Sequence, residues 1–242
     1  MVEKNERKKN TVLHKIFSLV FVGDADRVAF FAANGEYLNC SLVGAMIAKN
    51  IIQQHPKEQL TFIYNVFNSR IFEETVVKYG GKLERSRVGH AFVKEQMKAH
   101  DAAFSCENSG HFYFRDNFYA DSGVLCLLQI ASAFAKSLAE GHTFLDMFAE
   151  FMKYHQTEEK VVFVDKARGI QLIEERYCSK QLLYMEKFDG LSVRVSGPPE
   201  YWFTVKDSVT EDALKVVVEA EQKDVAEAAK AEILQLLECL GC

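Results

Sequence analysis

The chain has 242 residues, of which 48% are hydrophobic, and it carries a formal net charge of −5 at pH 7. This length and apolar content are enough for one large domain or two smaller ones, each with its own core. The acidic balance argues against a nucleic-acid-binding protein, which would normally present a basic face.

The first apolar run, IFSLVFV, begins at residue 16 after a mostly charged start. This order imitates a secretory signal, but the run is short and continues directly into Gly-Asp-Ala-Asp-Arg, so we interpret it as a buried strand. No stretch is long enough to span a membrane. Most of the six cysteines lie inside apolar runs, as reduced buried thiols do, which predicts a cytoplasmic protein.

Up to about residue 140 the expected elements alternate between strands and helices. Asn34-Gly35 predicts a hairpin turn, and a helix capped by Asn39 or Ser41 follows it. Further strands are expected at LTFIYNV, KLERSRV and AAFSCEN. Further helices are expected at IFEETVVKYGG, HAFVKEQMKAH, ADSGVLCLLQIASAFAKSLAEG and TFLDMFAEFMKYH. This alternation predicts an α/β layer with a mixed or parallel sheet.

After about residue 157 the pattern changes to short strands. These are VVFVD, LLYMEKF, LSVRVSG, YWFTVKD and LKVVVEA, and one closing helix, EQKDVAEAAKAEILQLLECLG, is expected after them. The predicted fold class is therefore α/β, with a mixed-sheet α/β domain followed by a smaller α+β C-terminal domain, divided within residues 155–160.

The first stretch that suits chemistry is GDADR. Asp24 and Asp26 lie one residue apart at a strand end, where two carboxylates suit Mg²⁺, an ion that takes few protein ligands and keeps waters. Arg27 would reach a phosphate or the two carboxylates. The alternative is a polar turn in which Arg27 neutralises two acids.

Two further stretches lie in the middle of the chain. Glu107, Ser109 and His111 converge in the loop of SCENSGHFYFRDN, where Glu and Ser suit vicinal hydroxyls and His suits a phosphate or a proton transfer. In SRVGHAFVKEQM, Gly89 allows a ligand to approach the backbone, and His90 opens a helix, where an anion is favoured. The alternatives are a polar hairpin loop and simple helix capping.

Two stretches of the C-terminal region compete as a phosphate site. RVSGPPE offers Arg194 and Ser196, and KDSVTED offers Lys206, Ser208 and Thr210. Hydroxyls and backbone N–H groups that follow a cation form a phosphate nest. Either stretch would otherwise be a β-turn.

In their order and spacing these stretches resemble the α-D-phosphohexomutases, the phosphomannomutase and phosphoglucomutase superfamily. VGDADRVAFF is similar to the family's metal loop Asp-Gly-Asp-x-Asp-Arg, RVGHAFVKEQM to its helix-opening Val-Gly-His or Thr-Gly-His, and CENSGH to its sugar loop Gly-Glu-x-Ser-Gly-His. The order of the stretches from DGLSV to VVVEA resembles the region around the family's phosphate loop. This resemblance favours KDSVTED over RVSGPPE as the phosphate loop of this chain. The resemblance covers residues 16 to about 221.

The resemblance implies reversible transfer of phosphate between O1 and O6 of a hexose, through a phosphoserine and with Mg²⁺. It implies metal ligands at Asp24 and Asp26 and a phosphate grip at Lys206, Ser208 and Thr210. Sugar or substrate contacts are implied at Arg27, Gly89, His90, Glu107, Ser109 and His111, with His90 also a candidate acid/base.

The chain differs from the family pattern at several positions. Val22 replaces the first metal aspartate, so we expect Mg²⁺ to bind weakly or not at all. Phe67 stands where the family often has a basic residue. Lys206 replaces an arginine and lacks its bidentate grip, and Asp212 replaces a proline and adds a negative charge. No serine has the context of the family's nucleophile, so we expect no turnover by the chain alone.

The resemblance divides the chain into three parts. Residues 1–30 would be a remnant of the family's second domain with the metal-type loop, residues 31–155 the sugar-recognition domain and residues 156–242 the phosphate-binding domain. Three roles stay open: half of a split mutase, a non-catalytic module that binds hexose phosphates or a protein, or a fragment or decaying gene product. An uncovered apolar face predicts a homo-oligomer or a complementary N-terminal-half protein.

Overall fold

The computed structural model describes residues 17–208 and 211–239. Its first sheet is antiparallel and contains β1 (Phe17–Phe21), β2 (Val28–Ala32) and β3 (Tyr37–Leu38). The β1–β2 connection is the GDADR stretch. The predicted Asn34-Gly35 turn is confirmed, since Gly35 has a φ of 88° and β2 and β3 pair on either side of it.

The second sheet has the order β5-β4-β6-β7-β8. Its strands are β4 (Thr61–Tyr64), β5 (Lys82–Arg85), β6 (Phe104–Cys106), β7 (Phe112–Phe114) and β8 (Ala120–Asp121). β4 pairs in parallel with β5 and β6, whereas the β6–β7 and β7–β8 pairs are antiparallel, so the sheet is mixed as predicted. The helices are α1 (Cys40–Gln54), α2 (Arg70–Lys78), α3 (His90–Ala99) and α4 (Gly123–Ala139).

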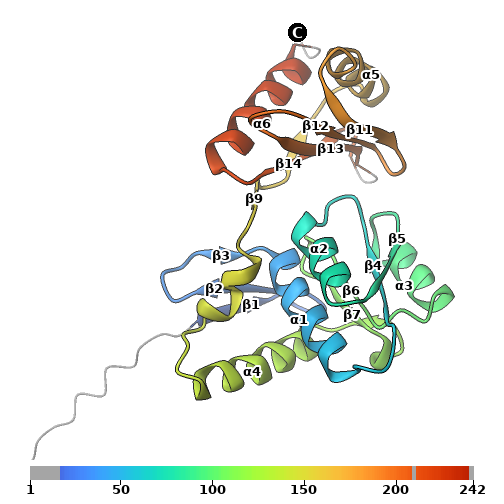
Figure 1. Ribbon diagram of the computed structural model, residues 1–242. Coiled ribbons are helices and arrows are strands. Elements are labelled where there is room, and N and C mark those ends of the chain that lie inside the picture. Colours follow the sequence, from blue (N-terminus) through green and yellow to red (C-terminus); the bar gives the residue numbers. More distant parts are fainter. Residues whose placement is uncertain (1–16, 209–210, 240–242) are drawn as a thin grey trace, which may run out of the picture.

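Helices cover both faces of this second sheet (Figure 1). Successive strand residues point to opposite faces, so Phe62 joins the large core with α1, α2 and α4, whereas Ile63 packs with Val93 and Met97 of α3. The carboxyl ends of β4 and β6 therefore meet at one edge of a three-layer body, where the loops that carry Asn65 and Glu107 begin.

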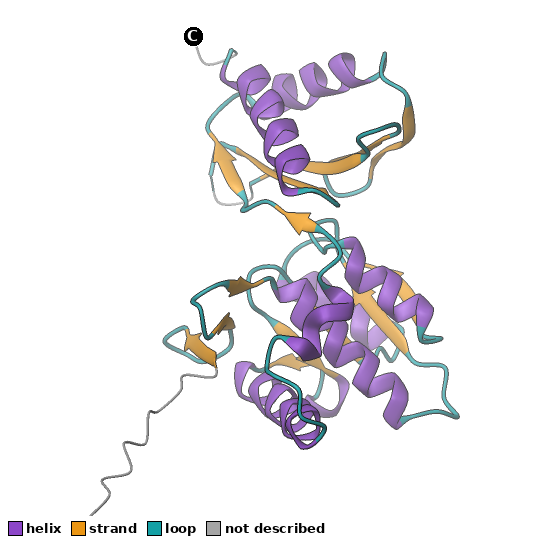
Figure 2. Cartoon of the chain, turned by 60° about the vertical axis from the view of Figure 1, so that its left-hand side comes forward, coloured by secondary structure: helices purple, strands orange, loops and turns teal. Residues whose placement is uncertain are grey.

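The third sheet is antiparallel and has the order β10-β14-β13-β12-β11, with β9 paired to β14. Its strands are β9 (His155–Gln156), β10 (Lys160–Val162), β11 (Leu182–Lys187), β12 (Leu191–Val195), β13 (Tyr201–Asp207) and β14 (Leu214–Ala220). Helices α5 (Lys166–Tyr177) and α6 (Lys223–Glu238) cover the face away from the rest of the chain (Figures 1 and 2). The predicted fold class is confirmed.

Two element predictions were wrong. The stretch TFLDMFAEFMKYH is not an α-helix, because only a short 3-10 helix, Asp146–Phe151, forms there. Its buried Phe148 and Phe151 lie three residues apart, the period of a 3-10 turn. The C-terminal region also has two helices rather than one. Gly169 weakens the sequence signal of α5. A Cβ there would lie 2.6 Å from the Cδ1 atom of Leu214, so a larger residue would require that side chain to shift.

We call described residues 17–154 the N-terminal unit and described residues from 155 onward the C-terminal unit. The predicted boundary between residues 30 and 31 falls inside β2, and the predicted boundary between residues 155 and 156 falls between the two residues of β9. The cysteines in the described part of the chain are free, and Cys40, Cys106 and Cys126 among them are buried. No described helix is both long enough and apolar enough to cross a membrane.

Candidate functional site

A cleft of 470 Å³ lies between the two units. Loops after β4, β5 and β6 form one wall, and β9, the end of β13 and β14 form the other. The predicted site residues that line it are Gly89, Glu107, Ser109, Lys206 and Ser208. Thr210, the remaining member of the predicted phosphate loop, lies outside the described residues.

Glu107 is the most firmly held acid of the cleft, with 4% of its surface exposed. Its Oε1 accepts hydrogen bonds from the Gly89 N–H at 3.0 Å and from Asn65 Nδ2 at 3.3 Å. Its Oε2 accepts from the Tyr113 hydroxyl at 2.6 Å, and burial together with this carboxylate raises the pKa of Tyr113 above its ordinary range. Three donors therefore fix a carboxylate that still has acceptor capacity towards the cleft.

Gly89 and His90 are neighbours at the start of α3, but only Gly89 lines the cleft. Gly89 has a φ of 123°, lines the cleft and gives its N–H to Glu107, so a side chain there would strain the backbone. His90 is exposed and lies outside the set of residues that line the cleft.

A polar network holds the loop that contains Glu107, Asn108 and Ser109. The sequence did not predict this network. Asn108 donates to Gln156 Oε1 at 2.6 Å and accepts from the Ser41 hydroxyl at 2.8 Å. Gln156 belongs to β9 and also accepts from Asn39 Nδ2 at 2.8 Å and donates to the Phe67 carbonyl at 3.1 Å. These partners lie up to 117 residues apart, so no spacing in the sequence could reveal them.

Lys206 lies beneath the cleft as half of a buried ion pair. Its Nζ contacts Asp189 Oδ1 at 2.8 Å, and the two side chains are 5% and 3% exposed. Asp189 Oδ2 accepts the Val88 N–H at 2.7 Å, which joins the two units. Burial alone would raise the pKa of Asp189, but the bonds from Lys206 and Val88 outweigh it and hold that pKa below its ordinary value.

The lining of the cleft contains more carboxylates than lysines. Ser208 lines the cleft, and its carbonyl accepts from Lys166 Nζ at 3.2 Å. The acidic residues of the lining are Glu107, Glu158, Glu159 and Asp207, and the lysines are Lys206 and Lys215. Lys215 pairs with Glu159 at 2.8 Å. A phosphate would therefore enter a cleft whose carboxylates outnumber its ammonium groups.

The GDADR loop is a tight turn in which the Val22 carbonyl accepts the Ala25 N–H at 2.9 Å. Asp26 Oδ1 is buried and has no hydrogen-bond partner within the described residues, and the nearest cation, Arg27 Nε, is 3.5 Å away. A free carboxylate oxygen beside a second acid, Asp24, fits a divalent cation that keeps several waters. Val22 offers only an isopropyl group, so this loop supplies two carboxylate ligands.

His111 does not line the cleft but lies behind it, beside the GDADR loop. Its Nδ1 makes a 2.9 Å hydrogen bond with the Ser109 hydroxyl, and its Nε2 lies 3.3 Å from Asp26 Oδ2 and 3.6 Å from Asp121 Oδ2. The imidazole that sequence reasoning placed against the substrate is thus one hydrogen bond removed from the cleft.

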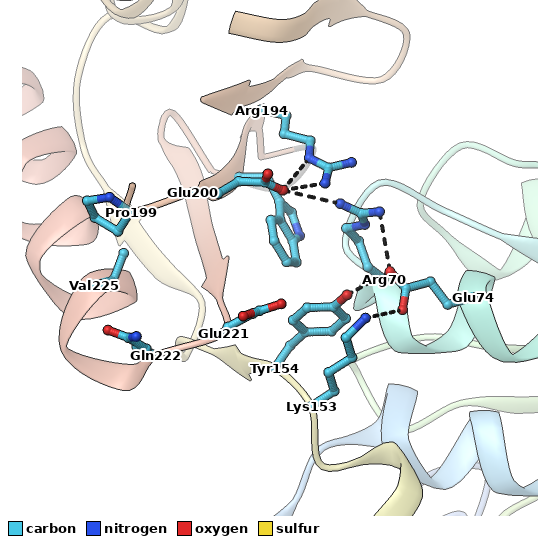
Figure 3. A pocket seen from close by; sticks show the side chains of 11 residues that line it. Arg70, Glu74, Lys153, Tyr154, Arg194, Pro199, Glu200, Glu221, Gln222 and Val225 are labelled. Atoms are coloured by element: carbon cyan, nitrogen blue, oxygen red, sulfur yellow. Dashed lines mark hydrogen bonds and ion pairs between the residues drawn. The ribbon is translucent and has the colours of Figure 1, made fainter. Parts of the chain in front are cut away.

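A second cavity, of 420 Å³, lies on the unit boundary and contains the RVSGPPE turn (Figure 3). Glu200 lies between the guanidinium groups of Arg194 and Arg70, with Arg194 Nε at 2.7 Å. The Arg70 guanidinium also stacks on Trp202, 4.9 Å from the ring centre. Arg194 is therefore engaged in an arginine–carboxylate cluster that connects the units, which agrees with a turn rather than a phosphate nest.

Known proteins resemble this chain over nearly all of its length. The family model for phosphoglucomutase/phosphomannomutase, alpha/beta/alpha domain III, matches residues 41–154. A phosphomannomutase from Methanocaldococcus jannaschii is 33% identical over 220 residues, which are 90% of this chain and 46% of that protein. The chain thus spans about half the length of the curated relatives it matches.

Solved structures share the fold. A phosphoglucomutase/phosphomannomutase family protein from Burkholderia thailandensis superposes with a TM-score of 0.75 at 19% identity, over 93% of this chain and 47% of that one. An Aspergillus fumigatus N-acetylphosphoglucosamine mutase, solved with GlcNAc-6P and magnesium, gives a TM-score of 0.64 at 13% identity, over 96% of this chain and 51% of that one.

Proposed function

Because the chain belongs to the α-D-phosphohexomutase superfamily, we propose that its cleft binds a hexose phosphate, of glucose or mannose, in the manner of a phosphomannomutase or phosphoglucomutase. The observation that carries this proposal is Glu107, a carboxylate fixed by the Gly89 N–H, Asn65 and Tyr113 and lining the cleft beside Ser109. A preorganised acceptor next to a hydroxyl suits the vicinal hydroxyl groups of a sugar.

We assign sugar recognition to residues 31–155 and the phosphate group to residues 156–242. Lys206 and Ser208 would face the phosphate, with the Gly89 backbone on the opposite side and the exposed His90 next to it in the chain. Thr210, which we also assign to the phosphate, lies outside the described residues. Lys206 already neutralises Asp189, and the lining carries four carboxylates, so the phosphate adds less affinity than the sugar hydroxyls do.

The reaction we associate with the site is the transfer of phosphate between O1 and O6 of the hexose. This chain would supply substrate binding, and His90, which is exposed beside Gly89, would have to turn towards the cleft to act as the acid/base. The phosphoryl donor would come from another polypeptide segment, so we expect no turnover by this chain alone. Mg²⁺ would supply charge neutralisation at the phosphoryl group, and Asp24 and Asp26 would hold it weakly. We place the protein in the cytoplasm.

The test is calorimetric titration of the 242-residue chain with glucose 6-phosphate and mannose 6-phosphate. We expect Glu107→Gln to weaken binding by about 1.5 to 3 kcal/mol, the usual worth of a hydrogen bond to a charged group. The exposed Asp116→Asn serves as the matched control and should leave the affinity unchanged.

Two results would contradict this proposal. Equal affinity of Glu107→Gln and the unaltered chain would place the ligand elsewhere. No heat of binding from either sugar phosphate at millimolar concentration would mean that the cleft does not bind this class. Turnover of glucose 1-phosphate would show instead that the phosphoryl donor lies within the chain.

A second candidate role, one part of a larger assembly, is favoured by the outer face of α4. Val124, Leu128 and Leu138 lie on this face, and Leu128 is 58% exposed. Either a second copy or a complementary N-terminal-half protein would cover these side chains. We expect light scattering to give a mass above 27.5 kDa for the unaltered chain and a return towards that mass for Leu128→Lys. A monomer in both cases would leave only the complementary protein as occupant.

A further inference from the structure

Three segments, two of them close in sequence, bring an imidazole and two carboxylates together behind the cleft. Asp26 comes from the β1–β2 loop, His111 from the start of β7 and Asp121 from the end of β8. One ligand atom of each lies within 4.8 Å of the others. This set shares only Asp26 with the pair of aspartates in the GDADR loop.

Backbone contacts hold the three loops in this arrangement. The Val28 N–H donates to the Gly110 carbonyl at 3.1 Å, and the Gly123 N–H donates to the Ala25 carbonyl at 3.2 Å. A Cβ on Gly123 would lie 3.0 Å from the Ala25 carbonyl oxygen, so this close approach favours glycine. The three side chains are therefore positioned by the fold rather than by their own attraction.

The spacing around His111 is that of ligands around an ion. Its Nε2 lies 3.3 Å from Asp26 Oδ2 and 3.6 Å from Asp121 Oδ2. A charge-assisted N–H···O bond is shorter, about 2.7–2.9 Å. Two ligand atoms bonded at about 2.0–2.1 Å to one tetrahedral ion lie about 3.4 Å apart. The distance to Asp26 is close to that second value, and the distance to Asp121 is slightly longer.

Partners outside the cluster orient the imidazole and one of the two carboxylates. Ser109 hydrogen-bonds His111 Nδ1 at 2.9 Å, so Nε2 is directed at the two carboxylates. Lys94 contacts Asp121 Oδ1 at 2.6 Å, which leaves Oδ2 for the cluster. Asp26 Oδ1 is buried without a hydrogen-bond partner in the part of the chain that the structure describes. The oxygen of Asp26 that approaches the imidazole is the other one, Oδ2, so the cluster is carried by Oδ2 of each aspartate and Nε2 of His111.

We propose that Asp26, His111 and Asp121 form a site for a divalent transition metal, with Zn²⁺ preferred. A nitrogen ligand beside two carboxylates suits Zn²⁺, whereas Mg²⁺ prefers oxygen ligands and near-ideal octahedral geometry. With three protein ligands, further coordination positions stay open to water. This proposal goes beyond sugar binding and does not depend on it, although Ser109 connects the site to the cleft wall.

The test is titration of the metal-free chain with ZnCl2, MnCl2 and MgCl2, followed by calorimetry, with Co²⁺ absorption as a readout of the coordination geometry. We expect one equivalent of Zn²⁺, bound more tightly than Mn²⁺ or Mg²⁺. Asp121→Asn and His111→Gln should each weaken Zn²⁺ binding at least tenfold, and Ser109→Ala should weaken it about 10- to 100-fold by releasing the imidazole. Asp116→Asn, which alters an exposed acid nearby, is the matched control.

Asp24→Asn distinguishes this site from the GDADR pair. If the three-residue set holds the ion, Asp24→Asn binds Zn²⁺ like the unaltered chain. If Asp24→Asn abolishes binding and Asp121→Asn does not, the ion belongs to the two loop aspartates and the inference is wrong. Equal, weak binding by every variant would also overturn it, because the ion would then lie on exposed histidines. Circular dichroism of each variant shows whether a loss reflects unfolding.

Discussion

Asp189→Asn should lower the free energy of unfolding by about 3 to 5 kcal/mol, because it leaves the Lys206 ammonium buried without its counter-ion. The only other carboxylate near that ammonium in the described residues is Asp207, at 3.7 Å and half exposed. The substitution also weakens the acceptor of the Val88 N–H, so the wall of the cleft next to Gly89 should loosen. Urea unfolding measures the first effect and hexose phosphate titration the second.

The double variant shows whether the pair itself is responsible. Asp189→Asn combined with Lys206→Met removes the unpaired ammonium, so it should be more stable than Asp189→Asn alone. Glu174→Gln is the matched control, because its partner Lys187 is 2.6 Å away but well exposed, and its loss should cost less than about 1 kcal/mol. Equal effects of the buried and the exposed substitution would contradict the importance of burial.

Glu219 should make the protein lose stability as the pH rises. It lies on β14 with 1% of its surface exposed, and its Oε1 accepts the Arg70 N–H at 3.1 Å from the start of α2. Burial raises its pKa from 4.5 to about 8, against the opposing contacts of Ser69 and Arg70 and with a small added effect of Glu73.

The sign follows from proton uptake. Between about pH 4.5 and pH 8 the folded chain holds a proton on Glu219 that the unfolded chain releases, so the free energy of unfolding falls as pH rises through this range. At 1.36 kcal/mol per pKa unit the loss is about 3 to 5 kcal/mol. Glu219→Gln mimics the protonated acid, so it should flatten this dependence and stabilise the protein at pH 8.5.

Urea unfolding of Glu219→Gln and the unaltered chain at pH 5, 7 and 8.5 measures this difference. Glu221→Gln, at an exposed acid two residues further on, controls for the loss of a negative charge. Parallel pH profiles for the unaltered chain and Glu219→Gln would show that the carboxylate is charged in the fold at neutral pH.

Periodicity and turn chemistry were sufficient to predict most of the elements. β4 and β6 are short, largely apolar runs bounded by polar loops, and Asn34-Gly35 specifies its turn almost alone. Helix α5 was not predicted from the sequence. Its buried positions recur only every fourth residue and begin with a glycine; they are Gly169, Ile173 and Tyr177. A short polar helix of this kind leaves little signal until the surface it covers is known.

The sequence predicted the loops that form the site, but not the contacts between their side chains. Glu107 and Ser109 were identified from residue type and from the resemblance, and both line the cleft. The partner of Lys206 lies in a turn 17 residues earlier, and the sequence offers no register that would bring them together. His111 lies 3.6 Å from Asp121, and no spacing in the sequence predicts that contact. Such pairings are set by tertiary contacts.

Gln156 has a consequence for how the two ends of a ligand influence one another. Its backbone pairs with Glu219 of β14, and its side chain accepts from Asn108, the residue between Glu107 and Ser109. Any shift of the C-terminal unit that tightens its grip on one end of a ligand therefore also moves an anchor of the loop at the other end. Reciprocity then requires that an occupied sugar end raises affinity at the phosphate end by the same factor as the reverse. Two fragments, a free hexose and inorganic phosphate, would reveal that shared factor where an intact hexose phosphate cannot.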